Sequence, residues 1–134
     1  MKSIAVIFTL CIVGALSALN EEQRNKIKEH RDKCIEETKV DIELVNKAHR
    51  GEWMVDDEKL RCFASCLLKK LDMISDDGSL KEDVTLAKMT LDVGADKAKE
   101  ILDKCKEITA SDVCEKGLKL MKCYTDNKAT IVVA

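Results

Sequence analysis

The stretch "KLRCFASCLLKKL" (residues 59–71) combines two cysteines, four positions apart, with apolar residues at helical spacing. Leucine, phenylalanine and alanine recur every three or four residues, which is the period of a helix that buries one face. Cys62 and Cys66 therefore share a face of that helix, with their Cβ atoms roughly 5–6 Å apart. A disulfide requires a Cβ separation of about 3.8 Å, so these two cysteines should not bond to each other. They can be metal ligands, a redox pair or anchors for two separate disulfides.

The first eighteen residues, "MKSIAVIFTLCIVGALSA", are typical of a secretory signal peptide. Lys2 is followed by an apolar run that ends in small side chains, and the next charge is Glu21. We expect residues 1–18 to be removed and residues 19–134 to form a single secreted domain. The apolar run is short for a bilayer span and no second one follows it, so an uncleaved membrane anchor is the alternative.

The charge balance and composition narrow the class of protein. The chain has 23 Lys and Arg against 25 Asp and Glu, for a net charge of −2, and loss of the leader with Lys2 makes it slightly more acidic. A mildly acidic chain with interspersed signs argues against nucleic acid or anionic lipid as the main partner. The sequence contains no proline, 5 glycines and few aromatic residues. Such a composition, rich in Lys, Glu, Leu and Ala, predicts an all-α fold.

The cysteine count predicts three disulfides. Of 7 cysteines, Cys11 leaves with the leader, and an even number in a short secreted chain indicates a disulfide framework. Cys114 and Cys123 are expected on one helix, facing opposite sides and about 13 Å apart along its axis, so they cannot pair either. With both exclusions, about two thirds of the fifteen possible pairings remain open.

Metal, redox and catalytic roles fit this pattern poorly. The Cys62 and Cys66 pair is CxxxC rather than CxxC, no second metal-type pair exists, and His30 and His49 lie among charged residues. A redox pair would be a CxxC at a helix N-terminus, whereas this pair lies within a helix. No GxSxG, HExxH or P-loop motif occurs, so we expect neither an enzyme nor a cofactor.

Turn and capping signals divide residues 19–134 into six helices with short connections. Gly51 and Gly78 are expected to end a helix and to form a turn, respectively. Capping boxes are expected at Thr38 and Ser79, and Thr109 or Ser111 is expected to cap the last helix. The predicted helices cover residues 20–38, 40–50, 58–74, 79–91, 96–107 and 112–127.

The spacing of all six cysteines is more specific than any single motif. It reads Cys34-x27-Cys62-x3-Cys66-x38-Cys105-x8-Cys114-x8-Cys123. This pattern, with "DDEKLRCFASCLLKKL" around the second and third cysteines and the "DDG" turn after them, resembles that of the insect odorant-binding proteins of the pheromone- and general-odorant-binding family. The resemblance implies a compact bundle of about six helices around an apolar pocket. It also implies the disulfides Cys34–Cys66, Cys62–Cys114 and Cys105–Cys123.

Two features depart from that family. Phe63 stands where a tyrosine is common, and "GEWMVDD" (residues 51–57) lacks a proline that is often found there. Neither departure threatens the fold, but Trp53 is expected to alter the pocket.

A small apolar ligand would bind to the inward-facing side chains of several helices, because it gains free energy by leaving water for an aliphatic wall. Each such residue can equally be ordinary core. Tyr124 could also offer its hydroxyl to a ligand oxygen. The expected ligand-binding residues are Trp53, Leu60, Phe63, Leu67, Leu71, Leu86, Met89, Leu118, Met121, Tyr124, Ile131 and Val132.

Two further expectations concern the regulation of binding. The apolar tail "KATIVVA" (residues 128–134), with Ile131 and Val132, is expected to fold back over the pocket, although it can also fray. His30 and His49 can titrate in a mildly acidic fluid and loosen a lid over the pocket, although surface histidines among charged residues usually have no such role.

The sequence therefore predicts a secreted carrier that takes odorants or pheromones through an aqueous sensory fluid. Its expected partners are a small volatile or lipid-like molecule and an olfactory receptor, and it is expected to be a monomer or a weak homodimer. One alternative is a carrier of small lipophiles in haemolymph or a reproductive secretion. A more distant one is a helical effector that binds a receptor or a membrane through an exposed apolar face.

Overall fold

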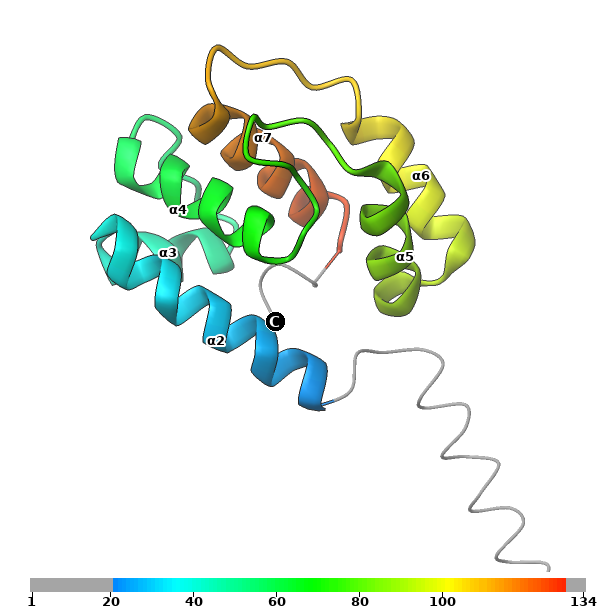
Figure 1. Ribbon diagram of the computed structural model, residues 1–134, viewed down its shortest axis with the longest axis horizontal. Helices are drawn as coiled ribbons and strands as arrows, with labels where there is room; N and C mark the ends of the chain where they lie inside the picture. The colour runs from blue at the N-terminus through cyan, green and yellow to red at the C-terminus, as the bar shows by residue number, and fades with distance from the viewer. Residues whose placement is uncertain (1–20, 130–134) are drawn as a thin grey trace, which may run out of the picture.

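The computed structural model describes residues 21–129, which form six helices and their connecting loops (Figure 1). The predicted all-α fold with six helices is thereby confirmed. The helices are α2 (Glu21–Thr38), α3 (Ile42–His49), α4 (Glu58–Lys70), α5 (Glu82–Val93), α6 (Ala95–Cys105) and α7 (Val113–Asp126).

Helix α4 lies at the centre of the bundle. It packs against α2 on one side and against α7 on the other, while α5 and α6 form an antiparallel pair that contacts α7 through α6 (Figure 1). The apolar stripe predicted on α4 is buried along its whole length and faces these neighbours, which explains why this stretch organises the fold. The buried members of the stripe are Leu60, Phe63, Ala64, Leu67 and Leu71.

Three disulfides join the helices and have the predicted pairing. Cys34–Cys66 links α2 to α4, Cys62–Cys114 links α4 to the start of α7, and Cys105–Cys123 links α6 to α7. The two cysteines of α4, four positions apart, thus anchor α4 to two different helices. The sequence separations of 32, 52 and 18 residues mean that each bond closes a long loop of the unfolded chain. Such cross-links stabilise a fold by about 3–4 kcal/mol each.

Helix α4 ends earlier than the sequence predicted, at Lys70 rather than at residue 74. Asp72 has a positive φ of 63°, and the Met73 amide turns back to the Leu68 carbonyl over 2.9 Å. A left-handed residue after the last turn, with such a backward hydrogen bond, terminates a helix. The apolar residues at 73 and 74 are therefore buried core residues in a loop.

The capping box predicted at Ser79 is wrong. Helix α5 starts at Glu82, and its N-cap Lys81 makes no side-chain cap. The Ser79 amide instead donates to the Asp77 carboxylate (2.9 Å), inside a turn that requires the φ of 89° at Gly78. The polar groups of the turn form hydrogen bonds with one another, so none of them caps the start of α5.

Aspartate side chains cap the starts of α3, α4 and α7. Asp41 accepts from the Glu43 amide at the start of α3, and Asp112 accepts from the Glu115 amide at the start of α7. Asp112 therefore replaces Thr109 or Ser111 as the cap of the last helix. Thr38, expected in a capping box, donates its hydroxyl to the Cys34 carbonyl of its own helix (2.7 Å).

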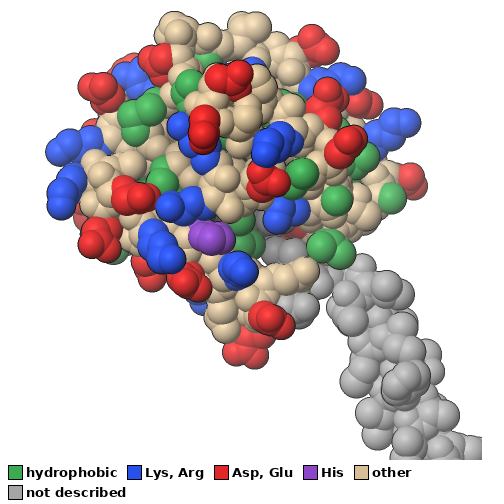
Figure 2. Space-filling view, in the orientation of Figure 1, with side chains coloured by type: hydrophobic (Ala, Val, Ile, Leu, Met, Phe, Trp, Pro, Cys, Tyr) green, Lys and Arg blue, Asp and Glu red, His purple; other side chains and the backbone are tan. Residues whose placement is uncertain are grey.

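The surface carries both signs of charge. Figure 2 shows Lys and Arg side chains interspersed with Asp and Glu over the visible face, with small hydrophobic groups between them. Within residues 21–129, each helix is too short or too polar to cross a lipid bilayer.

Candidate ligand-binding site

Four of the predicted ligand-binding residues converge on one small cavity, whose wall also contains exposed residues. Trp53 comes from the loop after α3, Leu60 and Phe63 come from the first half of α4, and Met121 comes from α7. The convergence follows from the packing of α4 against α7, which brings residues about sixty positions apart onto one surface. An apolar wall of this kind suits a hydrophobic ligand.

The other walls of the cavity come from α3 and α2. Val45 and Ala48 of α3 are buried and line it, together with Asn46, His49 and Arg31. This contribution of α3 was not predicted from the sequence. Its signal was the three-residue spacing of Val45 and Ala48, which places both side chains on one face of a short helix.

The cavity is small in this structure, at about 30 Å³. Pockets for drug-sized ligands are ten or more times larger, at about 300–1,000 Å³. A ligand would therefore have to displace side chains as it enters. Met121 is suited to such a change, because its unbranched thioether side chain adopts many shapes.

The other predicted residues of the described region contact the core but do not line this cavity. Leu67, Met89 and Tyr124 are fully buried, and Leu86 is half-buried against the same core. Leu118 lines a hollow beside Val55 at the surface. Leu71 lines a second cavity, and Ile131 and Val132 lie outside the described residues.

Two of the predicted binding residues have a buried polar atom that lacks a hydrogen-bond partner in the described part of the chain, and of the two only Trp53 lines the cavity. The Tyr124 hydroxyl and the Trp53 indole nitrogen have no hydrogen-bond partner among residues 21–129. Burial raises the pKa of Tyr124 far above its usual range, so its hydroxyl keeps its proton at any physiological pH. An uncompensated buried hydroxyl is costly, and a ligand oxygen that accepts from it would recover that cost.

The two histidines lie at different places. His49 lines the first cavity and His30 lines the second. Burial lowers the pKa of His30, which is partly offset by the nearby carboxylate of Glu29. A histidine-dependent release of ligand stays a prediction.

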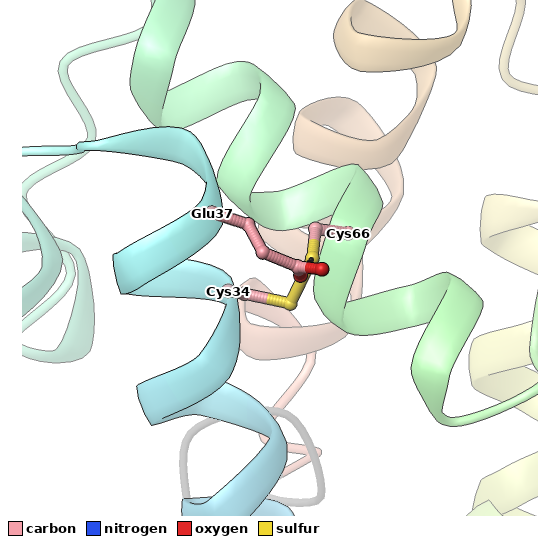
Figure 3. A group of neighbouring side chains, drawn as sticks. All are labelled: Cys34, Glu37 and Cys66. Atoms are coloured by element: carbon pink, nitrogen blue, oxygen red, sulfur yellow. Dashed lines mark hydrogen bonds between the residues drawn. A yellow bond between two sulfur atoms is a disulfide. The ribbon is translucent and has the colours of Figure 1, made fainter.

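Figure 3 shows a group of donor atoms that resembles a metal site but cannot act as one. The Glu37 side chain reaches from α2 to the disulfide between Cys34 and Cys66, and its Oε2 lies 3.2 Å from Cys66 Sγ. The two sulfurs are bonded to each other, so neither is a thiolate ligand. Only one carboxylate remains, and it pairs with Lys70 at 3.2 Å.

Comparison with known proteins shows to which family this chain belongs. Residues 16–127 match the sequence model of the PBP/GOBP family. This chain belongs to the PBP/GOBP family. The resemblance inferred from the cysteine spacing is thus confirmed, and the family consists of binding proteins rather than enzymes.

Individual relatives cover nearly the whole chain. General odorant-binding protein 56a of Drosophila melanogaster is 32% identical over 126 residues, which cover 94% of this chain and 90% of that protein. The structure of the fatty acid binding protein OBP56a from the oral disk of the blowfly Phormia regina is 34% identical, with a TM-score of 0.67 and coverage of 82% and 95%. Odorant binding protein 4 of Chrysopa pallens is 26% identical, with a TM-score of 0.72 and coverage of 82% and 93%.

Proposed function

We propose that this protein is a secreted carrier of small hydrophobic molecules, which it holds between α3, α4 and α7. The observation that carries the proposal is the convergence of Trp53, Leu60, Phe63 and Met121 on one apolar cavity. Membership of a family of binding proteins supports it. The residue types supply dispersion contacts and apolar surface, and no charged side chain apart from Arg31 lines the cavity.

Secretion is supported by the leader at residues 1–18 and by the disulfides. Three disulfides persist in an oxidising compartment and are rare in the cytosol. Within this proposal, residues 19–134 are the mature domain. Its aqueous environment is what makes a carrier necessary, because a volatile or lipid-like ligand dissolves poorly in water.

The proposal has two versions, which differ in the fluid into which the protein is secreted. An odorant or pheromone carrier in a sensory fluid is the first, and delivery to an olfactory receptor belongs with it. A non-olfactory carrier of lipophiles is the second, and it is favoured by one observation. The blowfly relative, at 34% identity, is described as a fatty acid binding protein from the oral disk. Localisation of the protein to antennal or to other secretory tissue would separate the two versions.

The binding test uses displacement of the neutral fluorescent probe N-phenyl-1-naphthylamine from the protein secreted by insect cells. Met121→Ala removes a side chain that lines the cavity, whereas Leu120→Ala removes its buried neighbour on α7, which does not line it. Both variants should lose stability by about 2–5 kcal/mol. We expect the affinity for the probe to change at least threefold in Met121→Ala and less than twofold in Leu120→Ala.

Two results would contradict the proposal. If the folded wild-type protein binds neither the probe nor any member of a panel of apolar volatiles and fatty acids, it is not a carrier of lipophiles. If the two alanine variants change probe affinity equally, the cavity between α3, α4 and α7 is not the binding site.

A further inference from the structure

The disulfide between Cys62 and Cys114 lies beside two hollows at the surface. Both cysteines line one hollow of about 340 Å³, and both also line another of about 370 Å³. Each of the two cysteines is only partly buried. In the other two disulfides one partner, Cys34 or Cys105, is fully buried. Among residues 21–129, Cys62–Cys114 is therefore the one disulfide that joins two partly exposed cysteines.

The two hollows carry opposite charges. The first, here called the basic hollow, contains Lys69, Lys70 and Glu37. Lys70 pairs with Glu37 at 3.2 Å, whereas Lys69 forms no ion pair within the described residues. The second, here called the acidic hollow, contains two carboxylates and one guanidinium group, from Glu58, Asp112 and Arg61. An anionic reagent should therefore reach the disulfide through the basic hollow, where a lysine is free to attract it.

The other disulfide beside the basic hollow is less open to such a reagent. Cys66 lines this hollow, but its partner Cys34 is fully buried. The Glu37 carboxylate also lies 3.2 Å from Cys66 Sγ, where it would repel an anion. An anionic thiol that enters the hollow is thus directed away from Cys66 and towards the bond between Cys62 and Cys114.

The two ends of that bond differ in their helical surroundings. Cys114 lies in the first turn of α7, whereas Cys62 lies within α4. The free amide groups of a first turn stabilise a negative charge, including that of a thiolate. The nearby carboxylate of Glu115 offsets this effect only in part, because it pairs with Lys119 at 3.1 Å. Since the more stable thiolate leaves more readily, attack should fall on Cys62 and release Cys114.

We propose that Cys62 is a modification site for a small anionic thiol of the glutathione type. The thiolate of the reagent attacks Cys62 Sγ and forms a mixed disulfide with it. The bond between Cys62 and Cys114 breaks, and its electron pair leaves on Cys114 Sγ, which takes a proton from water. One disulfide replaces another, so the step consumes no further oxidant or reductant.

The other two disulfides would hold the bundle together after this exchange. Cys34–Cys66 still joins α2 to α4, and Cys105–Cys123 still joins α6 to α7. The start of α7 alone loses its covalent link to α4. The modification therefore loosens one helix end and leaves the rest of the fold cross-linked. This inference goes beyond the carrier function and does not depend on it.

The test exposes the oxidised, secreted protein to reduced glutathione without denaturant. Samples are quenched with N-ethylmaleimide after short times, and non-reducing peptide mass mapping shows which cysteine carries glutathione and which carries maleimide. Lys69→Gln removes the unpaired lysine of the basic hollow. Lys99→Gln, on α6, is the matched control, because Lys99 lines neither hollow. The neutral thiol β-mercaptoethanol is the second reagent.

We expect glutathione on Cys62 and maleimide on Cys114, at a rate about fivefold above the labelling of the other disulfide cysteines. In Lys69→Gln the reaction with glutathione should slow by about twofold to threefold, because one attractive charge is lost. The control should react at the wild-type rate. The reaction with β-mercaptoethanol should be equally fast in all three proteins.

Three results would overturn the inference. The first is labelling of Cys34, Cys66, Cys105 or Cys123 as early as that of Cys114. The second is glutathione on Cys114 with maleimide on Cys62, which would reverse the direction of attack. The third is an equal effect of Lys69→Gln on both thiols, which would mean that the substitution alters access rather than charge. Each of these results leaves the carrier function untouched, because no ligand takes part in the assay.

Discussion

Gly117 of α7 packs directly against the backbone of Ser65 in α4. A Cβ atom placed on Gly117 would lie 2.4 Å from the Ser65 Cα and 2.6 Å from its amide nitrogen. Real Cβ atoms do not approach so closely, and the obstacle is backbone rather than a movable side chain. A glycine inside a helix predicts close packing against a neighbour, and the structure confirms this for Gly117, which sets the distance between the two helices that hold the proposed ligand site.

The close contact predicts that Gly117→Ala destabilises the protein. Alanine favours the helix by about 1 kcal/mol, but the clash requires α4 and α7 to separate, which should cost more than that gain. We expect a net loss of about 1–3 kcal/mol in the free energy of unfolding, measured by urea denaturation of the oxidised protein. Lys116→Ala on the same helix is the control and should change it by less than about 0.5 kcal/mol. A neutral or stabilising Gly117→Ala would refute the contact.

The position of Glu37 predicts that it protects a disulfide. Its carboxylate lies beside Cys66 Sγ (Figure 3), at 3.2 Å, and both residues line a hollow at the surface. A thiolate that attacks the disulfide there would be repelled, whereas Lys69 and Lys70 of the same hollow would attract it. In Glu37→Gln we expect the Cys34–Cys66 bond to be reduced about twofold to fivefold faster by glutathione.

The control for this prediction is the neighbouring variant Glu36→Gln, which should keep the wild-type rate. Cysteamine, a cationic thiol, should show the opposite dependence on Glu37. The rates can be followed by trapping free thiols and identifying the labelled cysteines by mass spectrometry. If both thiols respond alike to Glu37→Gln, the charge of Glu37 has no protective effect.

The buried hydroxyl of Tyr124, which a ligand reaches only when side chains move and the cavity widens, predicts selectivity for ligands that carry an oxygen. Tyr124→Phe should weaken binding of an alcohol by about threefold to tenfold, because one hydrogen bond is lost. An alkane of equal length should bind both proteins equally, and it serves as the control in the same displacement assay. Equal weakening for both ligands would mean that the substitution alters packing rather than a polar contact.

The lowered pKa values of two surface carboxylates predict how the stability of the fold changes at acidic pH. Hydrogen bonds from the Ser75 hydroxyl and the Ser79 amide lower the pKa of Asp77 from 3.8 to about 2. Those from Ser111 lower the pKa of Glu115 from 4.5 to about 2. Because the folded pKa is the lower one, both groups stabilise the fold above about pH 4.5, and the stabilisation is lost as the pH falls towards 2.

The double variant Asp77→Asn/Glu115→Gln should therefore show a flatter decline in urea midpoint between pH 4.5 and pH 2 than the wild-type protein. Asp32→Asn is the control, because Asp32 makes no hydrogen bond or ion pair among residues 21–129. The wild-type decline should persist in that control. An unchanged slope in the double variant would show that these two turns do not govern acid stability.

The sequence predicted those parts of the fold that depend on local pattern. The cysteine spacing can be read directly along the chain, and the stripe of Leu60, Phe63 and Leu67 is a property of one helix; the disulfides and the buried face predicted from them were confirmed. The end of α4 and the start of α5 were wrong, because the turn that contains Asp77 and Gly78 depends on which side chain accepts from which amide. Several residues of equal propensity compete for that role, and only the folded turn decides among them.

The site residues that lie on the buried face of a periodic helix could be predicted from the sequence. Leu60 and Phe63 follow from the period of α4, and Met121 follows from that of α7. The lysines of the second cavity do not, because lysines occur throughout the sequence and only the fold brings Lys26 of α2 and Lys88 of α5 to the same cavity. Long-range placement of polar residues leaves no periodic signal.

The most direct test of the carrier function is the stoichiometry of ligand uptake by the oxidised protein. Delipidated protein, incubated with excess dodecanoic acid, would be analysed by native mass spectrometry. We predict a complex with one ligand per chain, which disappears after the three disulfides are reduced and alkylated. A folded, oxidised protein that takes up no fatty acid, alcohol or apolar volatile at any tested concentration would contradict the account.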